Sequence, residues 1–456
     1  MSGIAELLAN LGYAVSGSDA KRSAVTARLE TTLGVVVHEG HAAAHIGDAE
    51  VVVYSSAVPP SNPEVEAAKA RGIPVIPRAE MLAELMRLRF SVAVAGSHGK
   101  TTTTSMIALV LERAGLDPTA VIGGRLSVFG SNARLGRGKY MVAEADESDR
   151  SFLMLWPSIA VITNIDREHM DSYGSLTDLQ QAFAEFANKV PFYGSVVACA
   201  DDPHLTTVLP RMKRRVVTYG LENQTANIFG ANVETGPFGA RCTVVRRSSR
   251  VKQSFKIAHE ALGTLNLVVP GRHNLQNALA AVAVADELGV EFSSVAKALA
   301  EFQGAERRFE RHGETAGVLV VDDYGHHPTE IAAVLAAARV TLARRLIVVF
   351  QPHRYSRTQQ LMDDFGPSLR EADEIVLTDI YAAGEDPIAG VTVGVLAEAV
   401  RRGSGRPVRV ARDLDAALAE TVAIARPGDA ILTLGAGSIA TLAPRLVAAL
   451  SDKERG

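Results

Sequence analysis

One stretch decides the fold: Ser91-Val-Ala-Val-Ala-Gly-Ser-His-Gly-Lys-Thr-Thr-Thr-Thr104. Its apolar beginning, Ser91 to Ala95, predicts a buried strand, and the apolar run Met106 to Val110 that follows predicts a helix. Between them, glycines allow backbone N–H groups to approach phosphate oxygens, and the start of the helix offers its positive end. The stretch therefore predicts a phosphate-binding loop between a strand and a helix.

The loop residues predict a site for ATP and Mg²⁺. Lys100 can reach the outer phosphates, and the hydroxyl of Thr101 can ligate the ion. The residue five positions before Gly99 is Val94 rather than glycine, so the loop is a compact variant of the common pattern. A guanine-specific GTPase would need an Asn-Lys-x-Asp segment after a later strand, where this chain has Asn164-Ile-Asp166. The expected nucleotide-binding residues of the loop are Gly96, Ser97, His98, Gly99, Lys100, Thr101 and Thr102.

Length and composition bound the class of protein. With 456 residues, 47% of them hydrophobic and 21% charged, the chain is expected to form about three compact domains. A net charge of −4 with interspersed signs offers no basic surface for nucleic acid. No apolar stretch approaches the ~20 residues of a membrane span, and no lysine or arginine precedes Lys21 to begin a signal segment. We expect a cytoplasmic protein without nucleic-acid or membrane partners.

Apolar segments alternate with helical patterns along most of the chain, as in doubly wound parallel α/β sheets. Alternating residues between Val216 and Val269 predict a small antiparallel insertion, and a helix is expected from Asn274 to Leu288. The strands expected in the first two thirds are Tyr13–Ser16, Glu50–Tyr54, Ser91–Ala95, Tyr140–Ala143, Ile159–Asn164 and Ser195–Ala200. Those of the last third, a further doubly wound unit, are Val318–Val321, Leu346–Phe350, Ile375–Leu377 and Ala430–Leu434.

The chain begins with a helical pattern, in which Ile4, Leu7, Leu8 and Leu11 recur at helical spacing. Open parallel sheets are usually built as strand, turn, helix and strand, so a helix without a preceding strand lacks its usual partner. We therefore expect a further strand upstream of Met1.

Two acidic clusters follow neighbouring strands: Glu144-Ala-Asp-Glu-Ser-Asp149 and Asp166-Arg-Glu-His-Met-Asp171. The carboxyl ends of parallel strands form the sheet edge where ligands bind, so both clusters can converge on the phosphate loop and hold divalent cations. Glu144 and His169 are the metal candidates. For Asp149 or Asp171, a role as a charge at a helix N-terminus is an equally good interpretation.

Two later segments add polar candidates. Asn274 and Asn277 share one face of their helix, although Asn274 taken alone fits a helix N-cap. Arg307 and Arg308 lie at a joint between domains, where closure could bring a guanidinium onto a transferring phosphoryl group. A solvent-exposed surface pair explains these two arginines equally well.

Two polar clusters follow buried strands of the last third: Asp322-Asp-Tyr-Gly-His-His-Pro328 and Gln351-Pro-His-Arg-Tyr-Ser-Arg357. They place carboxylates, a phenol, imidazoles and guanidinium groups at one sheet edge. This composition suits an anionic substrate, with Arg354 and Arg357 forming charge-assisted hydrogen bonds to a carboxylate.

In this order, the motifs resemble those of the Mur ligase family: the Gly-Lys-Thr loop, the Glu144 and His169 clusters, Asn274 with Asn277, and Arg308. The resemblance runs along the whole chain. It implies a UDP-sugar-binding domain over residues 1–88, a central P-loop ATPase domain with the antiparallel insertion over 89–304, and a C-terminal Rossmann-like domain over 305–456. Family members that act on UDP-N-acetylmuramate and L-alanine are similar in Ser97-His98, Glu144–Asp149, Asp322–Pro328 and Gln351–Thr358.

The resemblance also implies a reaction. The γ-phosphoryl group of ATP would pass to the lactyl carboxylate of UDP-N-acetylmuramate, and the amine of L-alanine would attack the resulting acyl phosphate. The catalytic residues that it implies are Lys100, Glu144, His169, Arg308 and His326, with Thr101, Glu144 and His169 at the metal. ATP would further contact Asn274, Asn277, Arg308 and Asp323. The substrates would contact His98, Tyr324, His326, Arg354 and Arg357.

Two alternatives stay open. A sister ligase that attaches a recycled tripeptide to the same nucleotide sugar shares the loop, although Gln351–Arg357 argues against it. A P-loop regulator or motor would hydrolyse ATP without joining metabolites. Two features depart from the family pattern: Ser97 stands where threonine is expected, and the Gly-rich turn that meets the UDP pyrophosphate would precede Met1. We expect a monomer or a homodimer.

Overall fold

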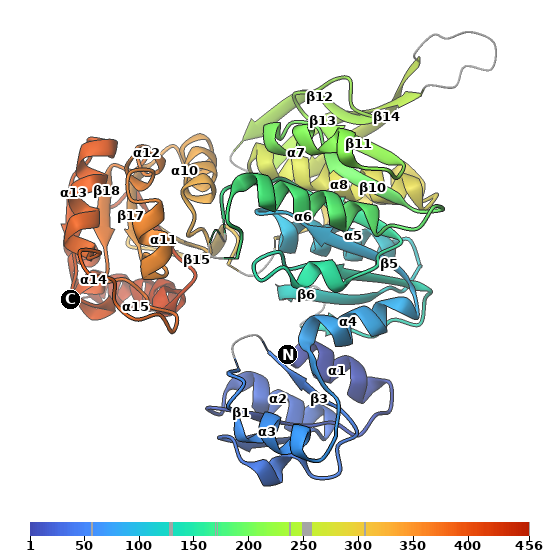
Figure 1. The fold of residues 1–456 in the computed structure, drawn as a ribbon. Coiled ribbons are helices and arrows are strands. Elements are labelled where there is room, and N and C mark those ends of the chain that lie inside the picture. Colours follow the sequence, from blue (N-terminus) through green and yellow to red (C-terminus); the bar gives the residue numbers. More distant parts are fainter. Residues whose placement is uncertain are drawn as a thin grey trace. The chain divides into compact units, whose positions relative to one another are not determined.

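A computed structural model describes residues 1–55, 58–126, 131–168, 170, 172–236, 239–248, 258–304 and 307–455 of the protein. Figure 1 shows the course of the chain. The chain divides into two compact units. The first comprises Met1–Val233, Arg241–Asn266 and Leu275–Phe302, and the second comprises Glu234–Ala240, Leu267–Asn274 and Gln303–Gly456. The three-domain division at residues 88 and 304 stays a prediction.

The first 88 residues form two small parallel sheets. Their strand pairs are β1 (Ser16–Asp19) with β2 (Val36–Glu39), and β3 (Val52–Tyr54) with β4 (Val75–Pro77). The helices are α1 (Ser2–Asn10), α2 (Ala24–Leu33), α3 (Pro63–Ala70) and α4 (Arg78–Arg87). The strand predicted over Tyr13–Ser16 begins only at its last residue, Ser16, because the chain uses residues 13–15 to leave α1. Gly12 adopts φ +92° and the Tyr13 N–H donates to the Leu8 carbonyl, which closes the helix end.

Strands β5 to β14 form one ten-stranded sheet. Its order is β14 (Ala258–Leu267), β13 (Gly239–Ser248), β12 (Ile228–Gly236), β11 (Val216–Gly220), β10 (Ser195–Cys199), β9 (Ile159–Ile162), β5 (Phe90–Ala95), β8 (Tyr140–Glu144), β6 (Thr119–Leu126) and β7 (Ser131–Arg134). Strand β5 is parallel to both of its neighbours, β8 and β9, so the carboxyl ends of all three meet at one edge.

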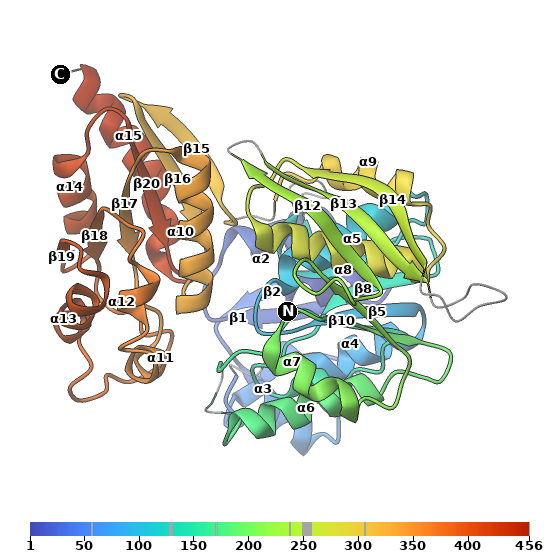
Figure 2. The same cartoon turned by 90° about the horizontal axis from the view of Figure 1, so that it is seen from above.

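Helices cover both faces of this sheet, as predicted for a doubly wound fold. Figure 2 shows α5 (Lys100–Arg113) and α8 (Arg272–Glu287) on one side, and α6 (Leu176–Asn188) and α7 (Pro203–Val208) on the other. A further helix, α9 (Phe292–Ala300), packs against α5. Because both faces are covered, β5 is buried along almost its whole length and reads as a continuous apolar run.

The antiparallel insertion begins later than predicted. Strand β11 pairs in parallel with both β10 and β12, so Val216–Gly220 extends the doubly wound sheet. Strands β12 and β13 are neighbours in the sheet and are separated by only two residues. A connection of that length can join only an antiparallel pair. The insertion therefore starts at β12 and continues the edge of the same sheet.

The second unit has a six-stranded sheet in the order β15 (Glu310–Thr315), β16 (Val318–Asp323), β20 (Asp429–Leu434), β17 (Arg345–Phe350), β18 (Glu374–Leu377) and β19 (Val408–Val410). Only β15 is antiparallel to its neighbour; the other strands are parallel, as predicted. The helices are α10 (Pro328–Leu342), α11 (Tyr355–Gln360), α12 (Phe365–Ser368), α13 (Val393–Ser404), α14 (Leu414–Ile424) and α15 (Leu442–Arg455).

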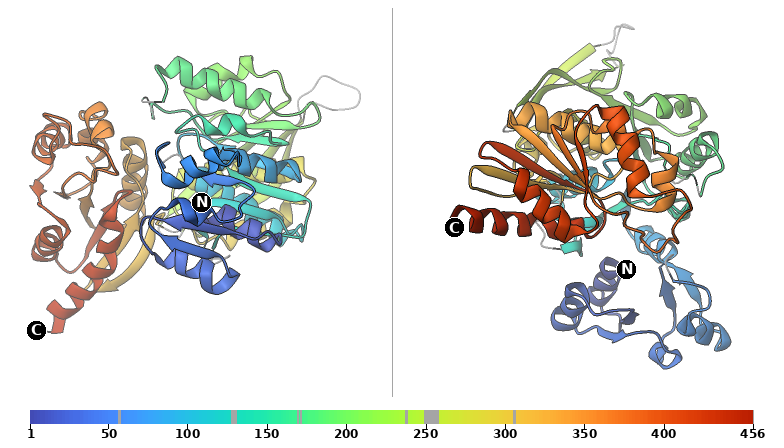
Figure 3. Two further views of the ribbon diagram at one scale, coloured as in Figure 1. Left: turned by 60° about the horizontal axis from the view of Figure 1, so that its bottom comes forward. Right: turned by 90° about the vertical axis from the view of Figure 1, so that its left-hand side faces the viewer.

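Alternation along the strands builds a core on each face of this second sheet. Leu319 and Val321 of β16 pack on the side of α10, α12 and α13. Val318 and Val320 of the same strand pack on the side of α14 and α15. Figure 3 gives two further views of the sheet and its helices. Among the helices in the described ranges, none combines the length and apolar character needed to cross a membrane.

Candidate active site

Two glycines shape the loop between β5 and α5. Gly96 has φ +134° and Gly99 has φ +80°, a region that favours glycine. A Cβ atom at Gly96 would lie 2.0 Å from the Thr163 Oγ1, and one at Gly99 would lie 2.6 Å from the Asn277 Oδ1. Both positions therefore require glycine for close packing as well as for backbone conformation. The loop is wedged between the end of β9 and helix α8.

We expect Gly96→Ala to destabilise the protein more than Gly115→Ala. Gly115, just after α5, has φ +75° with no atom within 4 Å of a built Cβ, so its replacement costs only the left-handed strain of about 1–2 kcal/mol. Gly96→Ala adds overlap with Thr163, worth about 1–3 kcal/mol more. Midpoints of urea unfolding measure both. Equal losses for the two variants would contradict the packing argument.

The segment after β9 holds the loop through its backbone. The Asn164 side chain accepts from the His98 N–H at 2.8 Å and donates to the His98 carbonyl at 3.0 Å. The Asp166 N–H donates to the Ser97 hydroxyl at 2.8 Å, and an Asp166 carboxylate oxygen lies 2.9 Å from the His98 Nε2. Asn164 therefore holds the loop in place. In the sequence, Asn164 served only as an argument against a GTPase, and this role was not predicted.

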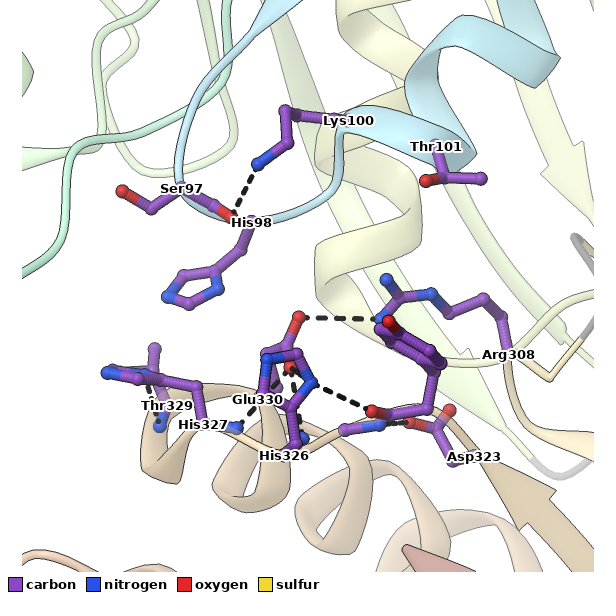
Figure 4. Close-up of polar contacts among 12 residues, drawn as sticks. Ser97, His98, Lys100, Thr101, Arg308, Asp323, His326, His327, Thr329 and Glu330 are labelled. Atoms are coloured by element: carbon purple, nitrogen blue, oxygen red, sulfur yellow. Dashed lines mark hydrogen bonds and ion pairs between the residues drawn. The ribbon is translucent and has the colours of Figure 1, made fainter. Parts of the chain in front are cut away.

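Lys100 is folded back into the loop. Its Nζ donates to the carbonyls of Gly96 at 2.7 Å and Ser97 at 3.1 Å, and to the Glu147 Oε1 at 2.8 Å. Figure 4 shows this side chain turned toward the Ser97 carbonyl. Burial acts to lower the pKa of Lys100, but attraction by Glu147 and then Glu144 outweighs it, so the pKa is raised. Lys100 is therefore a charged ammonium at neutral pH.

Thr101 and Glu144 meet at the edge where α5 begins and β8 ends. The Thr101 hydroxyl donates to the Glu144 carboxylate at 3.0 Å. A hydroxyl and a carboxylate beside a phosphate loop are oxygen ligands of the kind that Mg²⁺ prefers, so these residues fit the ion. His169, the other metal candidate, lies outside the described residues, as does Asp171.

Helix α8 carries both predicted asparagines, but Asn274 is not its N-cap. The helix begins at Arg272, so Asn274 lies within the first turn and its Nδ2 donates to the Pro270 carbonyl at 2.7 Å. Asn277 is buried one turn later, where its side chain lies close to Gly99. The loop and α8 therefore share one edge of the sheet. Gly99 and Asn277 are almost 180 positions apart in the sequence, so local sequence pattern does not predict their contact.

In the second unit, Asp323 anchors the chain at the end of β16. Its carboxylate accepts from the N–H groups of Phe309 and Gly325, both at 2.7 Å. Burial raises the pKa of Asp323 to about 6, against the attraction of Arg308.

Thr102, a predicted nucleotide-binding residue, is buried in the first turn of α5 in the first unit.

Arg307 and Arg308 are not a solvent-exposed surface pair, so that interpretation is wrong. Arg307 donates to the Asp322 carboxylate at 2.7 Å and to the Gly435 carbonyl at 2.7 Å, which ties together the ends of two strands. Arg308 lies over the Tyr324 ring at 5.2 Å, and its NH1 is 3.4 Å from the Glu330 carboxylate. Both arginines are therefore oriented by residues of the predicted substrate cluster, Arg307 by Asp322 and Arg308 by Tyr324.

The imidazole and phenol rings of the second unit form a contiguous group. His326 lies edge-to-face with Tyr324 at 5.3 Å between ring centroids, and its Nδ1 is 3.1 Å from the Tyr324 carbonyl. Figure 4 marks the contact of Arg308 with Glu330. His353 lies 5.6 Å from His326 and stacks on Tyr381 at 5.6 Å. His353 and Tyr381 are absent from the predicted site residues.

Arg357 contacts His353. Because a guanidinium only donates, the 3.2 Å contact of the Arg357 NH1 makes the His353 Nδ1 an acceptor. Burial, with repulsion from His326, Arg357 and Arg354, lowers the pKa of His353 to about 3. His353 is therefore neutral at physiological pH, with its proton on Nε2. The other predicted arginine, Arg354, lies 3.7 Å from the Glu385 carboxylate.

These features define a P-loop protein that binds nucleotide phosphates at the edge of a doubly wound sheet. Three family models match the chain: "Mur ligase family, catalytic domain" over residues 1–90, "Mur ligase middle domain" over 94–285, and "Mur ligase, glutamate ligase domain" over 307–437. The chain belongs to the Mur ligase family, a family of ATP-dependent ligases.

The relatives include curated proteins named UDP-N-acetylmuramate–L-alanine ligase. The one from Koribacter versatilis is 51% identical over 100% of this chain and 96% of its own length. The one from Myxococcus xanthus is 53% identical over 98% of this chain and 92% of its own length. Among solved structures, the UDP-N-acetylmuramate-alanine ligase MurC of Thermotoga maritima matches with a TM-score of 0.80, 28% identity and coverage of 99% and 97%. A murein peptide ligase of Psychrobacter arcticus matches with a TM-score of 0.71 and 27% identity, over 99% of this chain and 96% of its own.

Proposed function

We propose that this chain is an ATP-dependent ligase that joins L-alanine to the lactyl carboxylate of UDP-N-acetylmuramate in peptidoglycan precursor synthesis. The observation that carries the proposal is the match, along nearly the whole length of both chains, to curated proteins of that name. The chemistry requires activation, because a carboxylate is a poor electrophile until one of its oxygens becomes a phosphate leaving group. ATP supplies that phosphoryl group, and the amine then attacks the acyl phosphate.

In the first unit, we propose that the phosphate loop holds the triphosphate. The N-terminus of α5 points its free N–H groups at the phosphates, and Lys100 neutralises charge on the transferred group. Thr101, Glu144 and His169 would hold Mg²⁺, which supplies charge neutralisation between phosphate oxygens when bound. The contact between Thr101 and Glu144 supports this assignment for two of the three residues. Asn277 of this unit would face the adenine, as would Asn274 in the first turn of α8.

In the second unit, we propose roles for the residues around Tyr324. Arg308 would reach the γ-phosphate, Asp323 would contact the ribose, and His326 with Tyr324 would lie where nucleotide and sugar meet. Tyr324 and Glu330 orient Arg308, which supports its role. Arg354 and Arg357 would contact a substrate carboxylate. His98 would contact substrate from the phosphate loop.

The Arg357 contact adds a residue to this proposal. Because Arg357 occupies the Nδ1 of His353, the His353 Nε2–H is a directed donor that the same substrate could use. We therefore add His353 to the proposed substrate-binding residues.

Dependence of phosphate release on both substrates tests the proposed function. We expect repeated turnover to ADP and phosphate only when UDP-N-acetylmuramate and L-alanine are both present, with one amide product per ATP. One methyl group in a pocket is worth about 10–200-fold, so L-alanine should exceed glycine in kcat/KM by that factor. Release without either substrate would favour a P-loop regulator. Faster turnover with a free tripeptide than with L-alanine would favour the sister ligase.

The remaining parts of the proposal concern the surroundings of the reaction. We propose Mg²⁺ as the ion and the cytoplasm as the location, because ATP and nucleotide sugars are made and kept there. We also propose that the chain acts as a monomer or homodimer. Light scattering on the purified protein measures its mass directly, and any larger assembly would contradict that part.

A further inference from the structure

A second carboxylate of the cluster after β8 faces the phosphate loop. Glu147 is 1% exposed, and its Oε1 lies 2.8 Å from the Lys100 Nζ. Two contacts fix its backbone: the Tyr173 hydroxyl and the Arg150 N–H both donate to the Glu147 carbonyl, at 2.6 and 3.0 Å. Tyr173 is itself fully buried. The carboxylate is therefore held in place by its surroundings rather than by Lys100 alone.

Lys100 has no donor left for a phosphate while it keeps this arrangement. A lysine ammonium has three N–H donors, and here the carbonyls of Gly96 and Ser97 and the carboxylate of Glu147 accept from them. A nucleotide phosphate must displace at least one of these acceptors before Lys100 can bind it. Of the three, only Glu147 can carry a negative charge, and when ionised it is the strongest competitor with a phosphate.

We propose that Glu147 is a positioning residue that holds Lys100 folded back in the nucleotide-free loop and competes with the nucleotide phosphates for its ammonium. This inference rests on the proposed use of ATP at the loop. Glu144, three residues earlier, serves a different partner, Thr101. The two carboxylates of one short segment therefore divide their tasks between the metal-binding hydroxyl and the lysine.

The electrostatics of Glu147 agree with a contact to Lys100 that nucleotide binding must break. Burial raises the pKa of Glu147 to about 7, while the attraction of Lys100 opposes that rise. An ionised carboxylate left behind without Lys100 would face the negative phosphates in a buried place, which is costly. The resting contact thus stabilises the empty loop relative to the loaded one.

The binding of ADP to the full chain tests this inference, measured by calorimetry with Mg²⁺ and without nucleotide sugar or amino acid. We expect Glu147→Gln, which keeps the size of the side chain and removes its charge, to tighten ADP binding by about 3–10-fold, as for the loss of one competing charge-assisted bond. The control Glu185→Gln removes one negative charge from a half-exposed glutamate of α6 and should leave the affinity unchanged.

Tighter binding separates a competing contact from a structural one, because loss of a merely structural contact would loosen the loop and weaken binding. Unchanged or weaker binding by Glu147→Gln would overturn the inference. If that variant does not fold, Tyr173→Phe frees the Glu147 backbone by removing one hydrogen bond. It should tighten ADP binding by about 1.5–3-fold, and an unchanged or weaker affinity would again overturn the inference.

The experiment also distinguishes this inference from the proposed function. A native chain that binds ADP but forms no L-alanine-dependent product contradicts the proposed ligase activity and leaves the Glu147 inference standing. A native chain that forms the product, with a Glu147→Gln variant of unchanged ADP affinity, contradicts only the inference. A native chain that does not bind ADP contradicts both.

Discussion

Lys100→Ala is expected to lower ATP-dependent product formation by about 10³-fold, because one preorganised charge on a transferring phosphoryl group contributes about that much. The ammonium is buried and hydrogen-bonded within the loop, so water does not replace its charge. Lys100→Arg should not restore activity, because the larger guanidinium does not fit the contacts with Gly96 and Ser97. Product formation at saturating substrates, followed by chromatography, measures the loss.

The matched control for this prediction is Lys189→Ala. Lys189 also pairs with a glutamate, at 3.5 Å, but that partner, Glu185, is half exposed. An ion pair with one half-exposed partner contributes little, about 0–1 kcal/mol, so activity should stay within about twofold of the native value. Full activity in Lys100→Ala would contradict the assignment of the loop as the ATP-binding site.

The same substitution should have a pH-dependent effect on stability. Glu147 ionises with a pKa of about 7, so the buried pair carries both charges only above that pH. Lys100→Ala removes the attraction that favours the ionised carboxylate, and breaking a buried pair costs about 3–5 kcal/mol. The unfolding midpoint should therefore fall further below the native value at pH 8 than at pH 6.

Glu144→Ala is expected to reduce product formation by about 10²–10³-fold through loss of the proposed metal site. The Thr101 hydroxyl would remain at the edge of the loop without the carboxylate that lies 3.0 Å away. Raising Mg²⁺ to tens of millimolar should recover only part of the activity, since the ion keeps only its other ligands. Initial rates across a Mg²⁺ titration, in the native chain and the variant, measure both effects.

Glu84→Ala is the matched control, because this exposed glutamate of α4 forms its ion pair, within the described part of the chain, with the equally exposed Arg87. It should show the native Mg²⁺ dependence. If Glu144→Ala kept the native rate and the native Mg²⁺ dependence, the metal would have to be held elsewhere, and the assignment of Glu144 would fail. Removal of divalent ions with a chelator should stop the native reaction and also abolish the residual activity of Glu144→Ala.

Local sequence pattern is enough to locate parts of the site. A strand that ends in a glycine loop and a helix places Lys100 and Thr101, and Glu144 is the first polar residue after the apolar part of β8. The partners of the loop do not follow from pattern in the same way. Asn164 reads as an ordinary polar residue after a strand, yet it binds both backbone groups of His98 across 66 positions. The interpretation of Asn274 as an N-cap failed because helix α8 starts two residues earlier.

The sequence by itself determined the strand, loop and helix around Gly96 to Thr101 and the doubly wound rhythm of most of the chain. Both follow from short-range physics: apolar periodicity, the conformational freedom of glycine and the dipole of a helix start. Only the tertiary structure decided which carboxylate serves which loop residue. Glu144 reaches Thr101 across 43 positions and Glu147 reaches Lys100 across 47. That choice depends on the pairing of β5 with β8 and on the buried turn that follows, where burial strengthens a contact that sequence spacing does not encode.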